Sequence, residues 1–345
     1  MAALRDDAKW MRMALSWAKR AWGRTSPNPM VGAVVVLKNG VCAAAGCHWR
    51  AGEPHAEVNA LAAAGEKARG ASLYVTLEPC STTGRTPPCT DAILSAGIPR
   101  VVVGTLDPNP KHAGRGIEIL RSAGLDVSYG VEEQRCLELN EAFFKWIVRK
   151  RPFVLLKMAM TLDGKIATAN GSSQWISGAL ARRRVQKLRQ WADAIMVGGE
   201  TVRLDHPSLS VRIPKNWPRQ PRRLVATRSL SVSELGRMMP AGIPAETVCA
   251  ETPQEWDALL LRLGSENVTS LLIEGGGELA ASALQAGVLD KIEFHIAPKL
   301  LCGRESRTVM GGLNPHSLAE SWKLEKLSFR RLGEDLCVSA YPAQR

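Results

Sequence analysis

Two consecutive series of apolar strands alternating with helices constrain the fold of this chain more than any other feature. In each series, short runs rich in apolar and β-branched residues are followed by segments whose apolar residues recur at helical spacing. Such alternation is typical of layered α/β domains. The two series are separated at Lys150-Arg151-Pro152, where the helical pattern ends. We therefore expect two α/β domains, residues 1–150 and residues 151–345, and the chain is long enough for both.

The first series predicts a sheet flanked by helices. Asp6 and Asp7 are expected to cap a first helix that carries Trp10 on its apolar face. Asn39-Gly40 is a hairpin signal between the first two strands. The expected strands are residues 32–37, 41–46, 73–76, 100–104 and 125–128, and the later helices are residues 56–68, 90–96, 116–123 and 132–149.

The second series continues the alternation to the end of the chain. Its expected strands are residues 153–160, 194–197, 223–227, 270–273, 291–297, 322–331 and 336–341, with helices at residues 179–191, 253–263 and 278–286. The Pro- and Arg-rich residues 214–222 are expected to form a surface loop. No stretch approaches the ~18 apolar residues of a membrane span, and the N-terminus lacks the apolar region of a secretory signal. We expect a cytoplasmic protein.

The charge of the chain is compatible with several kinds of partner. The net charge is +12, and the excess of Lys and Arg is spread along the chain. Such a balance suits an anionic small molecule such as a phosphate ester or NADPH, and it also suits nucleic acid. A solvated basic surface explains it equally well. Most of the eight cysteines lie among apolar or small residues and are expected to be buried thiols, but Cys80 and Cys89 differ.

The first chemical signal is a set of metal-ligating residue types. His55 lies just before a predicted helix and is followed two residues later by Glu57, while Cys80 is followed by Cys89 across an eight-residue loop. One imidazole and two thiolates suit a zinc ion whose fourth position stays open for water. Glu57 is suited to moving the protons. This order is that of zinc nucleobase deaminases, although the spacing given for them between the cysteines is two residues.

Two neighbouring polar residues are interpreted in the context of this metal site. Glu78 competes with Glu57 for the role of base, but its place beside Cys80 fits a supporting role better. Asn28 lies in a Pro-rich turn that feeds a strand, and alone it would be a turn residue. Beside a zinc site, its amide is expected to bind the substrate because it both donates and accepts hydrogen bonds.

With these motifs, the sequence resembles the bifunctional riboflavin-biosynthesis deaminase–reductases. The matching segments run from the first helix to near the C-terminus and include TSPNPMVG, AGEPHAEVNAL, YVTLEPCSTTGRTPPCTDAI, DPNPKHAGRG, KMAMTLDGKIA, SQWIS, LRQWADAIMVGGETVRLDHPSLSVR, IEGGGELAASALQAGVLD and IAPKLL. The resemblance implies a cytidine-deaminase-like three-layer α/β/α domain followed by a dihydrofolate-reductase-like α/β domain.

The resemblance also implies two successive reactions. The first is zinc-dependent hydrolytic deamination of 2,5-diamino-6-ribosylamino-4(3H)-pyrimidinone 5′-phosphate. The second is NADPH-dependent reduction of the ribosyl group of the product to ribityl. It further implies a homo-oligomer, a dimer or tetramer built through the reductase domains.

Residues of the first domain take their roles by motif. The resemblance implies zinc ligation by His55, Cys80 and Cys89 and proton transfer by Glu57, with substrate contacts from Asn28, Arg85 and Asn109. One departure is Thr82, which stands where many relatives carry His. It affects no zinc ligand but alters the expected substrate contacts.

The second domain carries an unusual strand-to-helix turn. Gly275, Gly276 and Gly277 follow an expected strand, and three consecutive glycines exceed what a tight turn needs. Bare glycines let backbone N–H groups approach a phosphate at the positive end of a helix. No GxGxxG follows a strand, so a Rossmann site is not expected. The resemblance places NADPH at this glycine turn; the sequence leaves the choice between NADPH and NADH open.

The remaining reductase assignments rest on the resemblance. Asp205 matches an acidic catalytic position that also touches the cofactor. Its place before Pro207 is also typical of a turn residue. His206 stands where some relatives have a second acid. The implied substrate residues are Ser173, Arg189, Leu209, Arg212 and Glu274, and the implied cofactor residues are Ala159, Trp175, Thr201, Asp205, Gly275, Gly276, Gly277 and Glu278. Lys157 and Asp163 flank the strand end expected to approach the nicotinamide.

Two alternatives are kept. One is a nucleic-acid base deaminase with an RNA-binding second domain, which the basic charge permits but for which no RNA module is visible. The other is a deaminase whose second domain is structural and inactive, against which the glycine turn and Asp205 argue.

Overall fold

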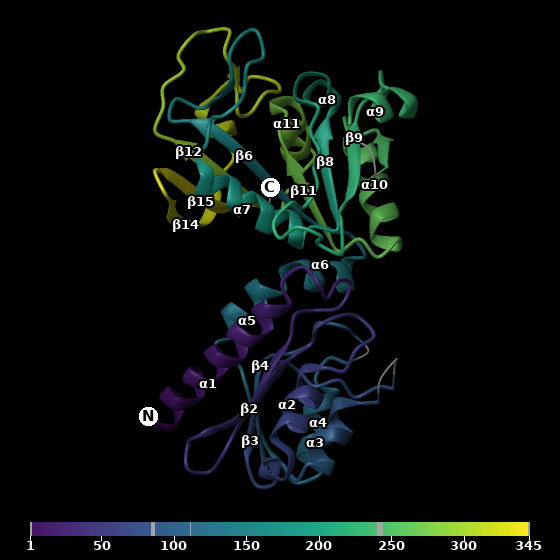
Figure 1. The fold of residues 1–345 in the computed structure, drawn as a ribbon, viewed down its shortest axis with the longest axis vertical. Helices are drawn as coiled ribbons and strands as arrows, with labels where there is room; N and C mark the ends of the chain where they lie inside the picture. The colour runs from purple at the N-terminus through teal and green to yellow at the C-terminus, as the bar shows by residue number, and fades with distance from the viewer. Residues whose placement is uncertain (1, 84–86, 111, 240–243, 344–345) are drawn as a thin grey trace. The chain divides into compact units, whose positions relative to one another are not determined.

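The computed structural model describes residues 2–83, 87–110, 112–239 and 244–343, with side chains from residue 6 onward. The chain divides into two compact units, Met1–Lys150 and Arg151–Arg345 (Figure 1). Among the helices within these described ranges, none combines the length and the hydropathy of a membrane crossing.

The first unit is built on a five-stranded sheet with the order β2-β1-β3-β4-β5. β1 is antiparallel to both β2 and β3, whereas β3, β4 and β5 run parallel. The strand bounds are β1 (Gly32–Val36), β2 (Cys42–Cys47), β3 (Ser72–Leu77), β4 (Arg100–Thr105) and β5 (Asp126–Tyr129). The hairpin expected at Asn39-Gly40 joins β1 to β2, with Gly40 at a φ of 74°.

Helices cover both faces of this sheet (Figure 1). One apolar cluster packs α1 (Ala2–Ala18) and α5 (Glu133–Leu139) on one face, and a second packs α2 (Ala56–Ala64), α3 (Cys89–Ser95) and α4 (Arg115–Ser122) on the other. The remaining helical elements are η1 (Lys19–Ala21), η2 (Gly65–Ala68) and α6 (Glu141–Arg149). α1 lies so close to β1 that a Cβ on Gly32 would meet the carbonyl oxygen of Ala14 at 2.0 Å. The expected three-layer α/β/α arrangement is confirmed.

The first helix differs from its prediction. It begins at Ala2, so Asp6 and Asp7 lie inside it and do not cap it. Asp7 is buried instead and receives hydrogen bonds from Arg100 Nη2 at 2.7 Å and from the Tyr74 hydroxyl at 2.7 Å. Its carboxylate thereby ties α1 to β3 and β4, a partnership that local sequence does not reveal.

The single helix predicted over residues 132–149 is also wrong, because it is interrupted at Asn140. The buried Asn140 side chain accepts a hydrogen bond from Met30 N at 2.8 Å and donates one to Met30 O at 2.9 Å. An amide can satisfy both backbone groups of a distant residue in this way, and the chain leaves helical geometry at Asn140 to do so.

The second unit is built on an eight-stranded sheet with the order β10-β9-β8-β11-β6-β12-β15-β14. The first six strands in that order run parallel, and β15 and β14 add antiparallel to the edge. The strand bounds are β6 (Phe153–Thr161), β8 (Ala194–Gly198), β9 (Arg222–Ala226), β10 (Ala245–Val248), β11 (Ser270–Glu274), β12 (Lys291–Ala297), β14 (Leu324–Leu332) and β15 (Asp335–Pro342). A separate ribbon pairs β7 (Lys165–Ala167) with β13 (Arg307–Thr308).

Helices again lie on both faces, which confirms the second α/β layer arrangement. One apolar cluster packs α7 (Ala179–Trp191), α8 (Gly199–Asp205) and α9 (Val232–Met238), and another packs α10 (Pro253–Ser265) and α11 (Gly277–Gln285). A short turn, η3 (Leu318–Glu320), precedes β14. α8, α9 and β10 were not expected from the sequence, although Ser231 and Glu234 form a capping box at the start of α9.

Candidate functional site

The three expected metal ligands converge in the first unit. His55, Cys80 and Cys89 each offer one ligand atom, and these atoms all lie within 4.8 Å of one another. His55 Nδ1 lies 3.2 Å from Cys89 Sγ and 3.5 Å from Cys80 Sγ. One imidazole nitrogen and two sulfurs facing a common point are the donor set that zinc accepts in catalytic sites. The residues therefore fit a zinc ion.

The ends of two helices and one strand bring these residues together. His55 is the N-cap of α2, Cys89 is the first residue of α3, and Cys80 follows the end of β3. Glu57 lies in the first turn of α2 and is 3% exposed. Helix N-termini favour negative charge, so this placement opposes, without outweighing, the effect of burial on the Cys89 thiol and the Glu57 carboxyl.

Hydrogen bonds among the proposed metal ligands, together with burial, shift the pKa values of this group. Hydrogen bonds from Cys89 and His55 lower the pKa of Cys80 to about 4. The pKa of the Cys89 thiol is raised, mainly by its hydrogen bond with the Cys80 thiolate and by burial. The hydrogen bond with Cys80 also raises the pKa of His55, and burial raises that of Glu57 to about 7. The protein's own contacts thus favour the thiolate form of Cys80.

Glu78 holds the loop after β4 by hydrogen bonds. It is 4% exposed, and its carboxylate accepts three backbone N–H bonds: Oε2 from Asp107 at 3.1 Å and Gly114 at 2.9 Å, and Oε1 from Gly116 at 2.9 Å. These bonds tie the loop after β4 to the chain next to Cys80. The carboxylate is occupied by structural contacts, so the geometry favours the supporting role over the role of base.

His48 is a site residue that sequence analysis missed. It is 2% exposed, its ring packs edge-on at 5.2 Å against that of His55, and its Nε2 lies 3.1 Å from Asn28 Nδ2. Its Nδ1 lies 3.2 Å from Pro54 O. Since that carbonyl can only accept, Nδ1 carries the proton, Nε2 accepts from Asn28, and Asn28 Oδ1 is left to accept from a substrate. A lone His in a sequence gives no such signal.

Of the other two substrate residues expected in this unit, only Asn109 lies within the described residues. Asn109 is half-buried, and its backbone N–H donates to Asp107 Oδ1 at 2.8 Å, within the loop that Glu78 holds. Thr82 is exposed. Arg85 lies outside the described residues.

A large pocket in the second unit brings together the expected reductase residues. Its volume is about 1370 Å³, above the ~300–1,000 Å³ of a pocket for one small molecule, so it has room for a dinucleotide and a substrate together. The expected residues that line it are Ala159, Ser173, Trp175, Arg189, Thr201, Asp205, Leu209, Arg212, Glu274, Gly275, Gly276, Gly277 and Glu278, together with Lys157 and His206.

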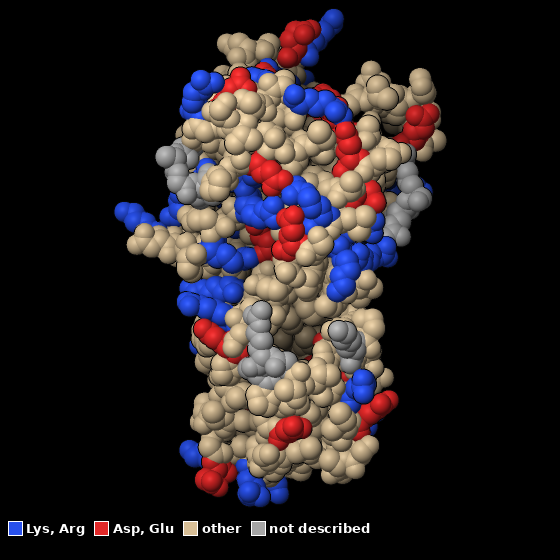
Figure 2. Space-filling model, turned by 90° about the vertical axis from the view of Figure 1, so that its right-hand side faces the viewer, with Lys and Arg blue, Asp and Glu red and all other residues tan. Residues whose placement is uncertain are grey.

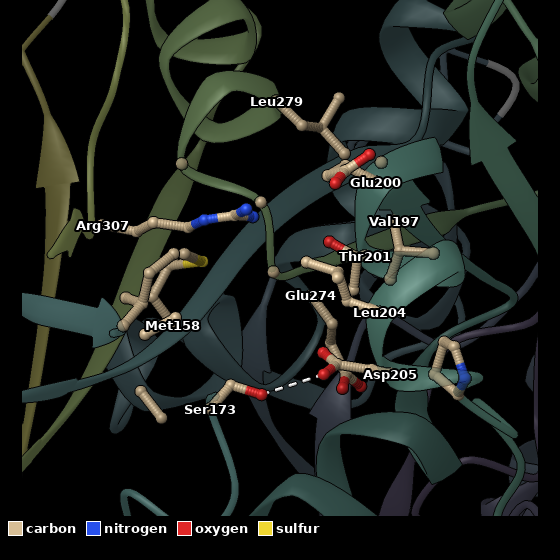
Figure 3. Close-up of a pocket in the computed structure, with 18 of the residues that line it drawn as sticks. Met158, Ser173, Val197, Glu200, Thr201, Leu204, Asp205, Glu274, Leu279 and Arg307 are labelled. Atoms are coloured by element: carbon tan, nitrogen blue, oxygen red, sulfur yellow. Dashed lines mark hydrogen bonds between the residues drawn. The ribbon is translucent and has the colours of Figure 1, made fainter. Parts of the chain in front are cut away.

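Asp205 is the last residue of α8 and not a residue of an isolated turn. Its Oδ1 accepts a hydrogen bond from Ser173 Oγ at 2.9 Å, and Figure 3 shows the two side chains meeting across the pocket. The helix ends because His206 adopts a left-handed conformation with a φ of 43°. A hydroxyl and a carboxylate on different segments are thereby placed where a sugar hydroxyl could join them.

The glycine turn links β11 to α11 at the pocket wall. Gly275 and Gly276 have φ values of 86° and 87°, a region that favours glycine. A Cβ on either would lie 3.5–3.9 Å from the nearest atoms of Thr201, so conformation and not space requires glycine here. The turn leaves backbone N–H groups at the start of a nine-residue helix, where an anion is stabilised.

Arg189 and Glu274, both expected to bind substrate, bind each other. Arg189 Nε and Nη2 donate to the two Glu274 carboxylate oxygens at 2.8 Å each, and Nη1 donates to Ser210 O at 3.1 Å. Arg189 is 9% exposed. Beside this pair, burial lowers the pKa of Lys157, which is equally buried. The pair therefore forms part of the pocket wall without adding net charge, and most of the Arg189 guanidinium is committed to Glu274.

Two other groups are structural. Asp163 is outside the pocket and accepts hydrogen bonds from Leu301 N at 3.1 Å and Cys302 N at 2.8 Å. Glu293, His295 and Cys337 form a second group of ligand types among the described residues. However, Arg184 binds Glu293 through both carboxylate oxygens at 3.0 and 2.8 Å, so its charge is already compensated.

The basic residues do not form an uninterrupted patch on the face in Figure 2. There, Lys and Arg side chains gather over residues 151–345, the upper part of the view, and acidic side chains lie among them. Several oppositely charged side chains of this unit form ion pairs, as in Arg228 with Glu251 and Glu255. Some of the Lys and Arg side chains are thus neutralised by acidic neighbours.

Comparisons with known proteins match both units. Residues 4–105 match the family model of the cytidine and deoxycytidylate deaminase zinc-binding region, and residues 152–338 match that of the RibD C-terminal domain. The riboflavin biosynthesis protein RibD of Aquifex aeolicus is 44% identical over 352 residues, covering 96% of this chain and 97% of that protein. That of Escherichia coli (strain K12) is 40% identical over 365 residues, covering 96% and 98%.

Solved structures agree with this similarity. RibD of Acinetobacter baumannii has a TM-score of 0.86 at 35% identity, and the match covers 99% of this chain and 100% of that one. A diaminohydroxyphosphoribosylaminopyrimidine deaminase/5-amino-6-(5-phosphoribosylamino)uracil reductase of Thermotoga maritima has the same TM-score at 34% identity and the same coverage.

Proposed function

The chain belongs to the RibD family of riboflavin biosynthesis proteins, and from that premise we propose which residues perform each of its two reactions. The protein is a bifunctional enzyme with a zinc-dependent deaminase unit and an NADPH-dependent reductase unit. It acts on a small molecule, 2,5-diamino-6-ribosylamino-4(3H)-pyrimidinone 5′-phosphate, which it deaminates before reducing the ribosyl group to ribityl. Neither alternative, an RNA-binding second domain or an inactive reductase-like domain, is supported by these relatives.

In the deaminase unit, His55, Cys80 and Cys89 hold the zinc ion. When bound, zinc supplies a hydroxide nucleophile at neutral pH by lowering the pKa of water. Glu57 lies next to Cys89 without being one of the three converging ligands, and it moves protons from water to the ring and the leaving amine. Asn28, oriented by His48, accepts a hydrogen bond from the pyrimidine. Asn109 and Arg85 bind the ribose phosphate.

In the reductase unit, the pocket around the glycine turn binds NADPH and the deaminated substrate side by side. When bound, NADPH supplies the hydride for the sugar carbon. Asp205 and Ser173 hold and protonate the opening ribose, because their mutual hydrogen bond puts both groups at the same point of the pocket. Among the residues that line the pocket, Thr201, Trp175 and Ala159 contact the cofactor in this proposal, and Arg212 and Leu209 contact the substrate.

The remaining expectations stay proposals. We propose a cytoplasmic homo-oligomer without a nucleic-acid partner. A salt-dependent RNA titration and a sedimentation measurement test the last two points.

The convergence of the three ligand atoms within 4.8 Å carries the deaminase assignment, and one exchange tests it. Glu57→Gln should keep its zinc yet lose deamination by about 10²–10⁴-fold, because the proton relay is gone while the ligands are intact. Zinc content and loss of the amino group, followed by mass spectrometry, measure the two effects.

Glu66→Gln is the matched control, because Glu66 is exposed in the same unit. It should leave both properties unchanged. Reduction of separately prepared deaminated substrate should be normal in both variants. Retained deamination in Glu57→Gln would contradict the assigned role, and purified wild-type protein without zinc would overturn the site itself.

A further inference from the structure

A segment without any sequence motif closes one side of the reductase pocket. We call residues 306–312 the cover segment. Its strand β13 pairs antiparallel with β7, Val309 N donates to Gly164 O at 3.0 Å, and Lys165 Nζ donates to Ser306 O at 3.2 Å. These bonds fix one edge of the cover segment to the turn after β6.

The other edge of the cover segment is fixed to the glycine turn. Gly311 N donates to Gly277 O at 3.0 Å, and Gly312 N donates to Glu278 Oε2 at 3.1 Å. The contact is so close that a Cβ on Gly277 would lie 2.7 Å from Thr308 O. Glu278, which was expected to touch the cofactor, thus also holds the cover segment against the start of α11.

The cover segment carries Arg307 on the pocket wall. Figure 3 shows its side chain extending across the pocket toward the loop that connects Glu274 to the helix of Leu279, which is the glycine turn. Within the described parts of the chain, the Arg307 guanidinium makes no hydrogen bond or ion pair, whereas Arg189 in the same pocket is committed to Glu274. Its five N–H donors are therefore available to a ligand.

A ligand between Arg307 and the glycine turn would meet positive potential from both sides. The turn offers backbone N–H groups and the positive end of α11, and Arg307 faces it with a planar cation that binds phosphate oxygens in pairs. Such an arrangement suits a group with two adjacent phosphates. The substrate has a single phosphate. For it there remains Arg212, which lines the pocket and whose guanidinium has no hydrogen-bond or ion-pair partner among the residues that the structure describes.

We propose that Arg307 binds the diphosphate that joins the two nucleosides of NADPH, opposite the glycine turn. The cover segment is then a cofactor-positioning element: its anchors at Gly164, Gly277 and Glu278 set where the diphosphate lies, and hence how the nicotinamide reaches the substrate. This proposal rests on the reductase function proposed above.

The test compares Arg307→Gln with Arg183→Gln in the full-length zinc-loaded protein. Arg183 is exposed on α7 and does not line the pocket, so its variant is a matched loss of charge. Direct fluorescence titration with NADPH and with NADH needs no turnover, which keeps the result independent of whether reduction is observed. We expect the Kd of both cofactors to rise by about the same factor, roughly tenfold, in Arg307→Gln only.

Further measurements separate the diphosphate from other phosphates. Arg307→Lys should recover part of the affinity, and the KM for the ribosyl substrate and the deaminase rate should be unchanged. A loss confined to NADPH would assign Arg307 to the 2′-phosphate and overturn the proposal. An unchanged Kd for both cofactors, or a raised KM for the substrate instead, would overturn it as well. Absence of reduction with intact NADPH binding would count against the proposed function and not against Arg307.

Discussion

The loop that carries Asn109 should loosen when the carboxylate of Glu78 is replaced by an amide. In Glu78→Gln, one oxygen can still accept the two N–H bonds that Oε2 receives from Asp107 and Gly114. The amide NH₂ then faces the N–H of Gly116, which loses its acceptor in a buried position.

The magnitude follows from this count of hydrogen bonds. One buried donor left without an acceptor costs about 1–3 kcal/mol, and the two retained bonds lose the strengthening that the carboxylate charge gave them. We therefore expect Glu78→Gln to lower the unfolding free energy of the first unit by about 2–3 kcal/mol. With a slope of about 1–3 kcal/mol per molar urea, the midpoint should fall by about 1 M.

Urea titration with deaminase activity as the probe measures this shift for the unit concerned. Zinc content should be unchanged because Glu78 is not a ligand, while kcat/KM for deamination should fall about tenfold as the loop loses its support. Glu118→Gln, an exposed exchange on α4, is the control and should change neither.

Two results would refute this reasoning. Equal urea midpoints for Glu78→Gln and Glu118→Gln would mean that the three hydrogen bonds do not hold the loop. Loss of deamination as complete as in Glu57→Gln, at unchanged stability, would make Glu78 the proton-moving group and Glu57 a supporting one.

Three further predictions concern other parts of the chain. Glu274→Ala should lower the unfolding free energy of the second unit by about 3–5 kcal/mol, because it leaves Arg189 buried without its partner. Replacing both residues by apolar ones should cost less. An unchanged urea unfolding midpoint in the single variant would contradict the paired geometry. Burial opposes ionisation of Asp7, but hydrogen bonds from Arg100 and Tyr74 outweigh it and hold its pKa below the usual value. A lowered folded-state pKa stabilises the fold above the unfolded-state pKa of about 3.9, and this stabilisation is lost as pH falls through the folded-state value. Asp7→Asn should thus be less stable than wild type at pH 7, and the gap should shrink as the pH is lowered below about 3.9. A gap of constant size would refute the ionic contribution. Gly276→Val puts a β-branched residue at a φ of 87° and should weaken NADPH binding in a titration without affecting deamination, so equal affinity would argue against the turn as a cofactor site.

Features that depend on residues close together in the chain could be predicted from the sequence. The alternation of strands and helices predicted both layered units, because apolar periodicity reports which side of an element is buried. The three residues that we propose as zinc ligands were also singled out from the sequence, and the structure brings them together. His55 and Cys89 lie at helix starts and Cys80 follows a strand, where residue type and local position together indicate the chemistry.

Partnerships between residues far apart in the chain were decided by the tertiary structure alone. No local pattern shows that Asn140 pairs with the backbone of Met30, that His48 orients Asn28, or that Glu78 holds a loop some thirty residues further on. The same holds for Arg307, whose neighbours carry no motif and which faces the glycine turn only because the cover segment is bonded on both edges. Hydrogen bonds and charges act over a few ångströms in space, so the sequence specifies which groups are present, and folding decides which of them meet.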